Sequence, residues 1–80
     1  MPIDYRKKKI SITGIVGVEE AEGLINHLQG KSDFTAVFSE CEHIHPANLQ
    51  VLMAAGVKVT AWPKDEALST FLKSALLAKN

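Results

Sequence analysis

Apolar and polar residues alternate from Lys9 onward. Ile10, Ile12 and the following Ile15 are interleaved with Lys9, Ser11 and Thr13, a pattern that is typical of a strand with one buried face. Gly14 and Gly17 fall near the end of this pattern and predict where the strand stops.

A helical period begins at Val18 and continues to Leu28. The apolar positions in this stretch share one helical face, and they are Val18, Ala21, Leu24, Ile25 and Leu28. Early glutamates suit the positive end of the helix dipole. Gly30 is placed to end the helix in the left-handed conformation.

The second strand and helix follow a different pattern. Phe34 to Phe38 is a nearly continuous apolar run, which predicts a central strand covered on both faces. Pro46 suits the first position of a helix, with His45 before it as the cap residue. Gly56 closes this short helix, whose buried stripe comprises Leu49, Leu52 and Met53.

The pattern then repeats once more. A strand at Val57–Trp62 stops at Pro63, and Asp65 and Glu66 open the last helix. The apolar stripe of that helix comprises Leu68, Phe71, Leu72, Ala75 and Leu76. Leu77 and Ala78 extend the stripe past its main face, which raises the question of a partner or self-association surface.

The whole chain, residues 1–80, is therefore predicted to be a single α/β domain in βαβαβα order. We expect a small, mostly parallel or mixed sheet of three or four strands with three helices and right-handed crossovers. With so few strands, the helices should lie mostly on one face and leave the other partly open. Residues 2–8 could add an edge strand, although no turn signal separates them from Ile10.

Composition narrows the function classes. Nine basic and nine acidic residues give a formal net charge of zero, so no global field favours nucleic acid or an anionic membrane. At 46% hydrophobic residues, the chain is unlike a disordered protein. The absence of an apolar run long enough to span a bilayer, or of a signal-peptide core, predicts a cytoplasmic protein without direct membrane insertion. The single cysteine, Cys41, excludes an internal disulfide.

Three stretches, in order, resemble the STAS domain, the family of sulfate transporters and anti-sigma factor antagonists. The stretches are Lys9–Gly14 with the helix at Val18–Leu28, then Val37–Leu52, then Gly56–Val59 with the final helix ending in Ser74–Leu77. In the second stretch, the residues that match the family pattern are Ser39, Ile44, Leu49 and Leu52. The resemblance implies a STAS-like fold and a docking role in bacterial regulation.

The chain departs from the family pattern at the residues through which phosphorylation regulates the family. The phosphate-accepting serine falls on Ala47, which has no hydroxyl, and the preceding Asp-Ser pair falls on His45 and Pro46. The family glycine falls on Asn48, and the aspartate at the strand end falls on Val37. The resemblance therefore implies a module that is not phosphorylated at the usual site.

One cluster has residue types that bind metals. In an extended backbone, Cys41, His43 and His45 point to one face, and a thiolate with two imidazoles could begin a zinc site, with His27 or Glu42 as a fourth ligand. The alternative is a loop at the strand end, with a buried inert cysteine and exposed histidines. The paired spacings of structural zinc sites are missing, which favours this alternative.

Three other features each have two interpretations. The start of the helix at Pro46 could hold an anion, or be a bare helix end. The run Arg6–Lys9 could contact phosphates, or be a solvated edge that blocks aggregation. Trp62 could anchor an interface or cap the core beneath the last helix.

We expect a regulatory protein–protein interaction module and no enzyme, because the sequence has no carboxylate pair, nucleophile–base set or cofactor fingerprint. The expected partner-binding residues are His43, His45, Pro46, Ala47, Asn48 and Gln50. The expected partner is a regulatory kinase, an anti-sigma-like factor or a transporter subunit, and a homodimer is left open. The alternatives are a small subunit of a membrane transport assembly and a metal- or anion-binding domain using Cys41, His43 and His45. Asn48→Arg is expected to weaken partner binding without unfolding the domain.

Overall fold

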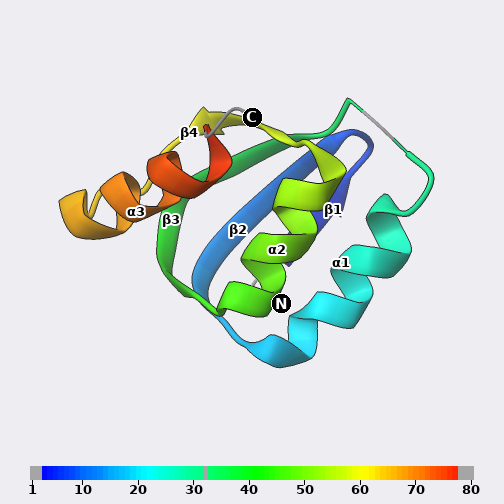
Figure 1. Cartoon of the computed structure of the whole chain (residues 1–80), viewed down its shortest axis with the longest axis horizontal. Helices are drawn as coiled ribbons and strands as arrows, with labels where there is room; N and C mark the ends of the chain where they lie inside the picture. The colour runs from blue at the N-terminus through cyan, green and yellow to red at the C-terminus, as the bar shows by residue number, and fades with distance from the viewer. Residues whose placement is uncertain (1–2, 32, 78–80) are drawn as a thin grey trace.

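A computed structural model describes residues 3–31 and 33–77 of the chain. In this part, strands and helices alternate as the hydrophobic pattern predicts (Figure 1). The elements are β1 (Ile3–Arg6), β2 (Lys9–Val16), the 3-10 helix η1 (Val18–Glu20), α1 (Ala21–Leu28), β3 (Thr35–Ile44), α2 (Pro46–Ala55), β4 (Lys58–Ala61) and α3 (Glu66–Leu76).

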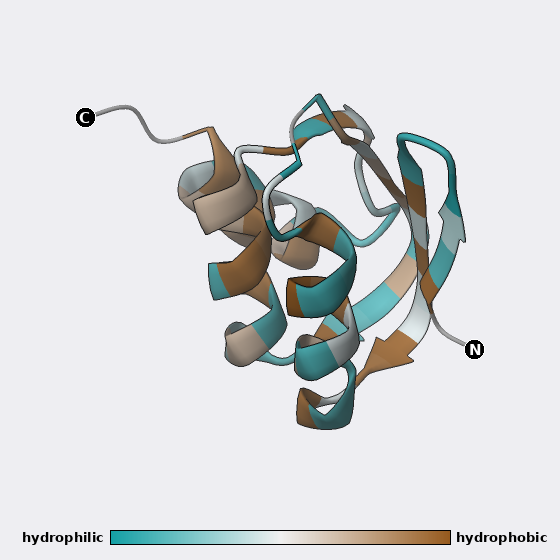
Figure 2. Cartoon of the chain, turned by 90° about the vertical axis from the view of Figure 1, so that its right-hand side faces the viewer, coloured by the Kyte–Doolittle hydropathy of each residue, from teal (hydrophilic) through white to brown (hydrophobic). Residues whose placement is uncertain are grey.

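The four strands form one mixed sheet in the order β1-β2-β3-β4. β1 is antiparallel to β2, whereas β2, β3 and β4 are parallel to one another. Successive crossovers of one hand between neighbouring parallel strands place their helices on one side. Figure 2 shows the helices gathered on one side of the sheet. The predicted small α/β fold with a mixed sheet and three helices is thus confirmed.

The hairpin of β1 and β2 confirms the extra edge strand expected within residues 2–8, of which residue 2 lies outside the described residues. Arg6 pairs with Lys9, so Lys7 and Lys8 form a two-residue loop. Lys7 has a φ of 51°, a conformation that hairpin loops usually give to glycine, asparagine or aspartate. The turn therefore had no recognisable signal in the sequence.

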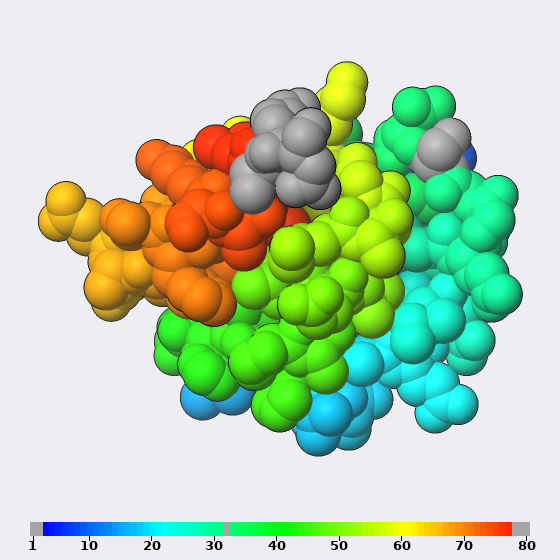
Figure 3. Space-filling model, viewed as in Figure 1, coloured from blue at the N-terminus to red at the C-terminus, as the bar shows by residue number. Residues whose placement is uncertain are grey.

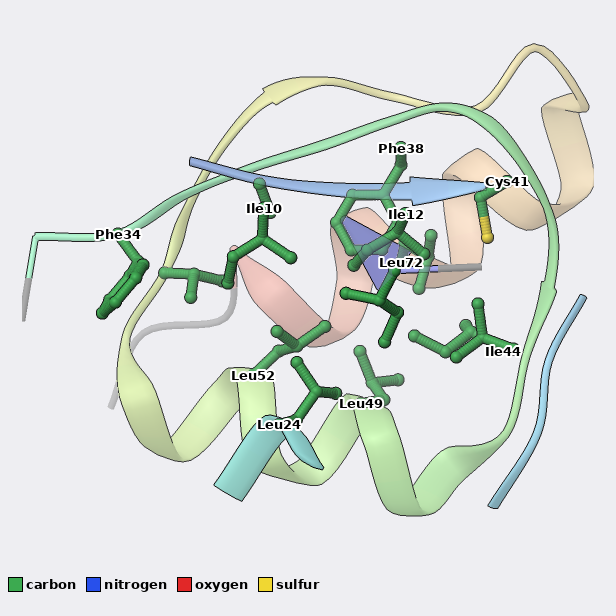
Figure 4. Close-up of a cluster of buried hydrophobic side chains, with 14 of the residues drawn as sticks. Ile10, Ile12, Leu24, Phe34, Phe38, Cys41, Ile44, Leu49, Leu52 and Leu72 are labelled. Atoms are coloured by element: carbon green, nitrogen blue, oxygen red, sulfur yellow. The ribbon is translucent and has the colours of Figure 1, made fainter. Parts of the chain in front are cut away.

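One hydrophobic core fills the space between the sheet and the helices (Figure 4). Ile10 of β2 pairs with Ala36 of β3, and Ala36 pairs with Val59 of β4, so one inward-facing row crosses three strands. The helices add aliphatic side chains that are almost fully buried: Leu24, Leu28, Leu49, Leu52 and Leu72. The alternating apolar residues of the strands and the regularly spaced apolar residues of the helices thus pack together in one layer.

β3 is longer than the apolar run predicts, because it continues to Ile44. Two register shifts against β2 each add one residue to β3, the first between Val37 and Glu40 and the second between Cys41 and His43. Each added residue changes which positions face the core. Cys41 and Ile44 are buried as a result, three residues apart, and His43 is exposed.

The prediction that the central strand is covered on both faces is wrong. Phe38 and Ala36 are buried beneath the helices, but Thr35 and Val37 on the other face are only half-buried. The apolar run contains small and aromatic residues without polar alternation, so the sequence did not distinguish one covered face from two.

β2 ends at Val16, directly before Gly17, one of the two glycines predicted to mark its end. It passes through Gly14, which adopts a φ of +64°, and reaches the buried Val16. Gly14 thus adopts the left-handed conformation inside the strand, next to the second register shift against β3. Ile15 therefore lies on the uncovered face and is 67% exposed.

Parts of the predicted helical stripes are exposed. Val18, Ile25, Met53 and Phe71 have exposures of 55%, 47%, 41% and 50%. Ala78, the last residue of the predicted stripe, lies outside the described residues. Each helix rests on the sheet through a narrow line of leucines, so apolar side chains at the margins of the stripe reach solvent. Within the described residues, no helix has the length and apolar content needed to cross a membrane.

Trp62 lies against the core, as one of its two interpretations expects. Its ring stacks on Phe38, with centroids 6.4 Å apart and planes 9° from parallel. The ammonium of Lys73, a residue of α3, lies 5.7 Å from the centroid of the indole. The tryptophan thus joins the end of β4 to the last helix and is half-buried by this packing.

Candidate functional site

The carboxyl ends of β2 and β3 meet at one edge of the molecule, where open α/β sheets commonly bind their ligands. Val16 pairs with Ile44, and the next amide, His45 N–H, donates to Val16 O at 2.8 Å. We call this edge the rim, and it comprises residues 15–20 and 43–50. In Figure 1, η1 and the first turn of α2 lie side by side at the lower edge, and Figure 3 shows their side chains forming one continuous surface there.

Asn48 fastens the two halves of the rim together. Its side-chain Nδ2 donates to the carbonyl of Gly17 at 2.7 Å, across 31 positions of sequence. The residue is 0% exposed, and its Oδ1 has no hydrogen-bond partner in the described residues. The expectation that Asn48 is an exposed contact residue is therefore wrong. Asn48→Arg would force a cation into the core, so it would not be a clean test of binding.

His45 caps α2 with its side chain. Its Nδ1 accepts a hydrogen bond from the amide of Ala47 at 3.0 Å, and Pro46 occupies the first helical position. The amides of Asn48 and Leu49 donate to His45 O at 3.0 and 3.4 Å. Because Pro46 has no N–H, the first-turn donors are already used within the protein. The alternative of an anion site at this helix start is therefore not supported.

The remaining predicted contact residues lie on different parts of the rim. His43 and Pro46 are exposed, and Ala47 is half-buried in the first turn of α2. Gln50 is exposed and lines a shallow groove of about 610 Å³ between α1 and α2. The other residues of that groove are Ile25, Leu28, Gln29, Gly30, Lys31, Val51, Ala54 and Ala55.

Two aliphatic residues of the rim are exposed, although the hydrophobic pattern predicts that both are buried. Ile15 at the end of β2 is 67% exposed, and Val18 in η1 is 55% exposed. Ile15 pairs with His43 across the sheet, so an apolar and an imidazole side chain stand next to each other on the uncovered face. The sequence assigned both aliphatic residues to buried stripes. Ile15 is exposed because it lies on the uncovered face of the sheet. Val18 is exposed because the chain forms a 3-10 helix there, before α1 begins.

The proposed metal ligands are not brought together. Cys41 is 4% exposed and faces the core, whereas His43 points to the uncovered face after the second register shift. His45 uses Nδ1 to cap α2. Among the described residues, no group of three histidine, cysteine or acidic side chains is placed to hold a metal ion. The expected common face was wrong because β3 is not regular between Val37 and His43.

Cys41 has the surroundings of a structural thiol. Its Sγ lies 3.7 Å from the carbonyl oxygen of His43, to which it donates. Burial raises the pKa of the thiol above its ordinary value of 9.0, and the neighbouring Glu42 acts in the same direction, against the hydrogen bond to His43. A reactive thiolate needs the opposite environment. The expectation of a buried cysteine is confirmed.

The basic run lies on the β1–β2 hairpin, at the opposite end of the sheet from the rim. Arg6 pairs with Asp4 at 3.0 Å, and the Lys8 ammonium lies 4.9 Å from the centroid of the Phe34 ring. Phe34 also meets His27, whose ring stands 4.2 Å from Tyr5. The hairpin is thus anchored to α1 by aromatic contacts, away from the predicted docking residues.

Comparison with known proteins adds no identification. No protein-family model matches the chain, and no curated protein matches it. The interpretation of the rim therefore depends on its geometry and on the resemblance of the sequence motifs.

Proposed function

We propose that this protein is a non-catalytic regulatory module of the STAS type that binds another protein through the rim. The observation that carries the proposal is the hydrogen bond from Asn48 to Gly17, because it holds two chain segments in one fixed surface. A binding surface that is ordered before contact loses less entropy when the partner binds. The buried Asn48 amide, which holds this surface in place, therefore supports a binding role for the rim.

The composition of the rim supports a protein as its partner. Ile15 and Val18 supply exposed apolar area, and His43, Pro46 and Gln50 surround it with polar and small side chains. Apolar contacts bordered by polar groups are typical of protein–protein interfaces. The buried thiol and the occupied first-turn amides leave the rim without an evident nucleophile or anion cradle.

The partner class follows from the resemblance. A STAS-like module would bind a regulatory kinase or an anti-sigma-like factor in the cytoplasm, or a subunit of a membrane transport assembly. Ala47 occupies the usual phosphorylation position without a hydroxyl, so any switch would reside in the partner. The rim would then present one constant surface to a partner that changes state.

The test compares variants at exposed rim positions with matched variants elsewhere. Wild-type protein, Ile15→Asp with Val18→Asp, and the control Met53→Asp with Phe71→Asp are each immobilised and exposed to lysate of the source organism. All four side chains are more than two-fifths exposed, so each pair adds two carboxylates without opening the core. We expect the wild type and the control pair to retain a protein that the rim pair loses.

Titration of the purified partner then measures the affinity of each variant, with a loss of about tenfold or more expected for the rim pair alone. The captured protein also separates the partner classes, because a kinase or sigma-factor regulator and a transporter subunit are readily distinguished. Equal affinity of the rim pair and the wild type would show that the rim is not the docking surface.

A further inference from the structure

The charges of the described residues are divided between the two ends of the sheet. β2 begins at the β1–β2 turn and ends at the rim, so the turn and the rim lie at opposite ends (Figure 1). The end with the turn has six basic and two acidic residues, which are Arg6, Lys7, Lys8, Lys9, Lys31, Lys58, Asp4 and Asp33. The opposite end has seven acidic residues and one basic residue, which are Glu19, Glu20, Glu22, Glu40, Glu42, Asp65, Glu66 and Lys64. The turn end therefore attracts anions, although the chain has no net charge.

A shallow groove lies at the turn end, and we call it the turn groove. It has a volume of about 670 Å³, and its lining consists of Arg6–Lys9, Tyr5, Asp33 and Thr35. The Thr35 amide donates to the Lys8 carbonyl at 2.8 Å, which fixes the turn against the start of β3. Asp33 is the single acidic residue of this lining, so the three lysines leave it positive even with Arg6 paired to Asp4.

The lysines that face solvent here have no carboxylate partner within the protein. Among the described residues, the two ion pairs are Arg6–Asp4 and Lys64–Glu40. Lys7, Lys9 and Lys58 are exposed and belong to neither pair. Their charges are therefore compensated only by solvent ions.

The turn departs from two local preferences at Lys7. Its φ of 51° is a conformation that hairpin loops usually give to glycine, asparagine or aspartate. Its neighbours along the chain, Arg6 and Lys8, carry the same charge. Both features oppose folding of the turn, and departures of this kind concentrate at functional sites.

Protection of the sheet edge does not account for this cluster. Charges that block aggregation are needed along the outer strands, which are β1 and β4. Arg6 and Lys58 lie on those strands. Lys7 and Lys8 lie in the turn, and Lys9 lies on the inner strand β2. Of the two interpretations of the run Arg6–Lys9, contact with phosphates thus fits its position better.

We propose that the turn groove binds a compact anion that has several phosphate groups, through Lys7 and Lys9. A lysine ammonium binds phosphate oxygens as a point charge with three donors. Thr35 pairs with both Lys9 and Lys58, so these two lysines lie on strands about 10 Å apart, on the same face. A ligand with phosphates at more than one point can therefore contact Lys7 and Lys9 in the groove and extend toward Lys58.

Other anionic occupants fit the turn groove less well. Single-stranded nucleic acid needs exposed aromatic rings on which bases stack, but Phe34 is 3% exposed and the Tyr5 ring already meets His27 at 4.2 Å. A duplex or an anionic membrane is a broad surface, whereas a groove favours a ligand that enters it. The turn groove lies at the opposite end of the sheet from the rim, so this inference and the proposed function can fail separately.

The test titrates inorganic tripolyphosphate into the protein at 0.15 M salt and measures the heat of binding. The turn pair is Lys7→Gln with Lys9→Gln, and the control pair is Lys64→Gln with Lys73→Gln. Each pair removes two exposed positive charges, so both change the net charge equally. We expect the wild type and the control pair to bind one tripolyphosphate with similar affinity. The turn pair should bind about tenfold more weakly or less.

Lys7→Asn separates binding from folding. Asparagine tolerates a φ of 51° better than lysine does, so this variant should unfold at a higher temperature than the wild type. It should nevertheless bind tripolyphosphate more weakly, because it lacks the ammonium group. Thermal unfolding of every variant also confirms that it is folded.

Three results would overturn the proposal. The first is a wild type that shows no saturable binding at millimolar tripolyphosphate, and the second is an equal loss of affinity in the turn pair and the control pair. The third is tighter binding to a DNA duplex or to vesicles with phosphatidylserine than to tripolyphosphate at equal phosphate concentration. That result would assign the lysines to a macromolecular surface.

Discussion

The side-chain amide of Asn48, at the start of α2, donates to the carbonyl of Gly17 in the loop after β2, at a distance of 2.7 Å. The same carbonyl accepts a hydrogen bond from the backbone amide of Glu20, the last residue of η1, at 3.1 Å. The Gly17 carbonyl thus fixes both η1, in the connection from β2 to β3, and the first turn of α2. Since Asn48 is fully buried, this contact also decides how the rim is held.

Asn48→Asp should destabilise the protein by about 2–4 kcal/mol. The substitution keeps the shape of the side chain but replaces the donor with a buried carboxylate that faces the Gly17 carbonyl. Gln50→Asp, an exposed change on the same helix, should cost less than about 0.5 kcal/mol. Urea unfolding measures both. Similar midpoints for the two variants would contradict the structural role of Asn48.

Glycine-to-alanine changes should have opposite signs at two positions. Gly23 lies in α1, and an added Cβ would meet the Tyr5 hydroxyl at 3.6 Å, an ordinary contact. Gly23→Ala should therefore stabilise the protein by about 0.5–1 kcal/mol. Gly56 ends α2 with a φ of +68° and has open space around it, so Gly56→Ala should lower stability by about 1 kcal/mol through backbone strain alone. Thermal unfolding of both variants checks the pair, and a shared sign would refute it.

Stability should fall at alkaline pH in part because of Cys41. Burial raises the pKa of this thiol above 9.0, so the unfolded chain loses the proton at a lower pH than the folded protein does. The unfolded state then binds fewer protons, and the free energy of unfolding decreases as pH rises above about 9. Cys41→Ala should be less stable at neutral pH but should lose less stability between pH 8 and pH 10. Urea midpoints across this range test the slope, and an unchanged slope would count against a buried thiol.

The stack of Trp62 on Phe38 should contribute to stability through area and shape. Trp62→Ala removes a half-buried ring that also contacts Lys73, and it should cost about 2 kcal/mol. Trp62→Phe keeps a flat ring against Phe38 and should cost less than about 1 kcal/mol. Because Trp62 is the only tryptophan, unfolding of these variants is followed by circular dichroism. An equal loss in both variants would indicate that the stack itself contributes nothing.

Local pattern was sufficient for the order of the elements. Period-two alternation at Ile10 and Ile12, helical spacing at Leu24 and Leu28, and the glycine at the end of α2 are short-range signals, and the structure agrees with each of them. The caps agree as well, since Asp65 Oδ1 accepts the amide of Leu68 at 2.9 Å at the start of α3. These features follow from residues that are close in sequence, where backbone preference and side-chain chemistry act directly.

The candidate site depended on distant contacts. The sequence predicts Asn48 as a partner-contacting residue, yet a carbonyl 31 positions away makes its burial favourable. The separation of Cys41 from His43 depended on two register shifts that no residue type signals.

The sequence by itself determined an alternating α/β chain and the absence of a hydroxyl at Ala47, because local periodicity and residue identity carry that information. Only the tertiary structure decided which face of each strand is covered, and hence that Ile15 is exposed and that Lys9 and Lys58 flank Thr35. The physical reason is that these relations arise from pairing between strands. The register of a sheet is chosen by the packing of its whole face against the helices.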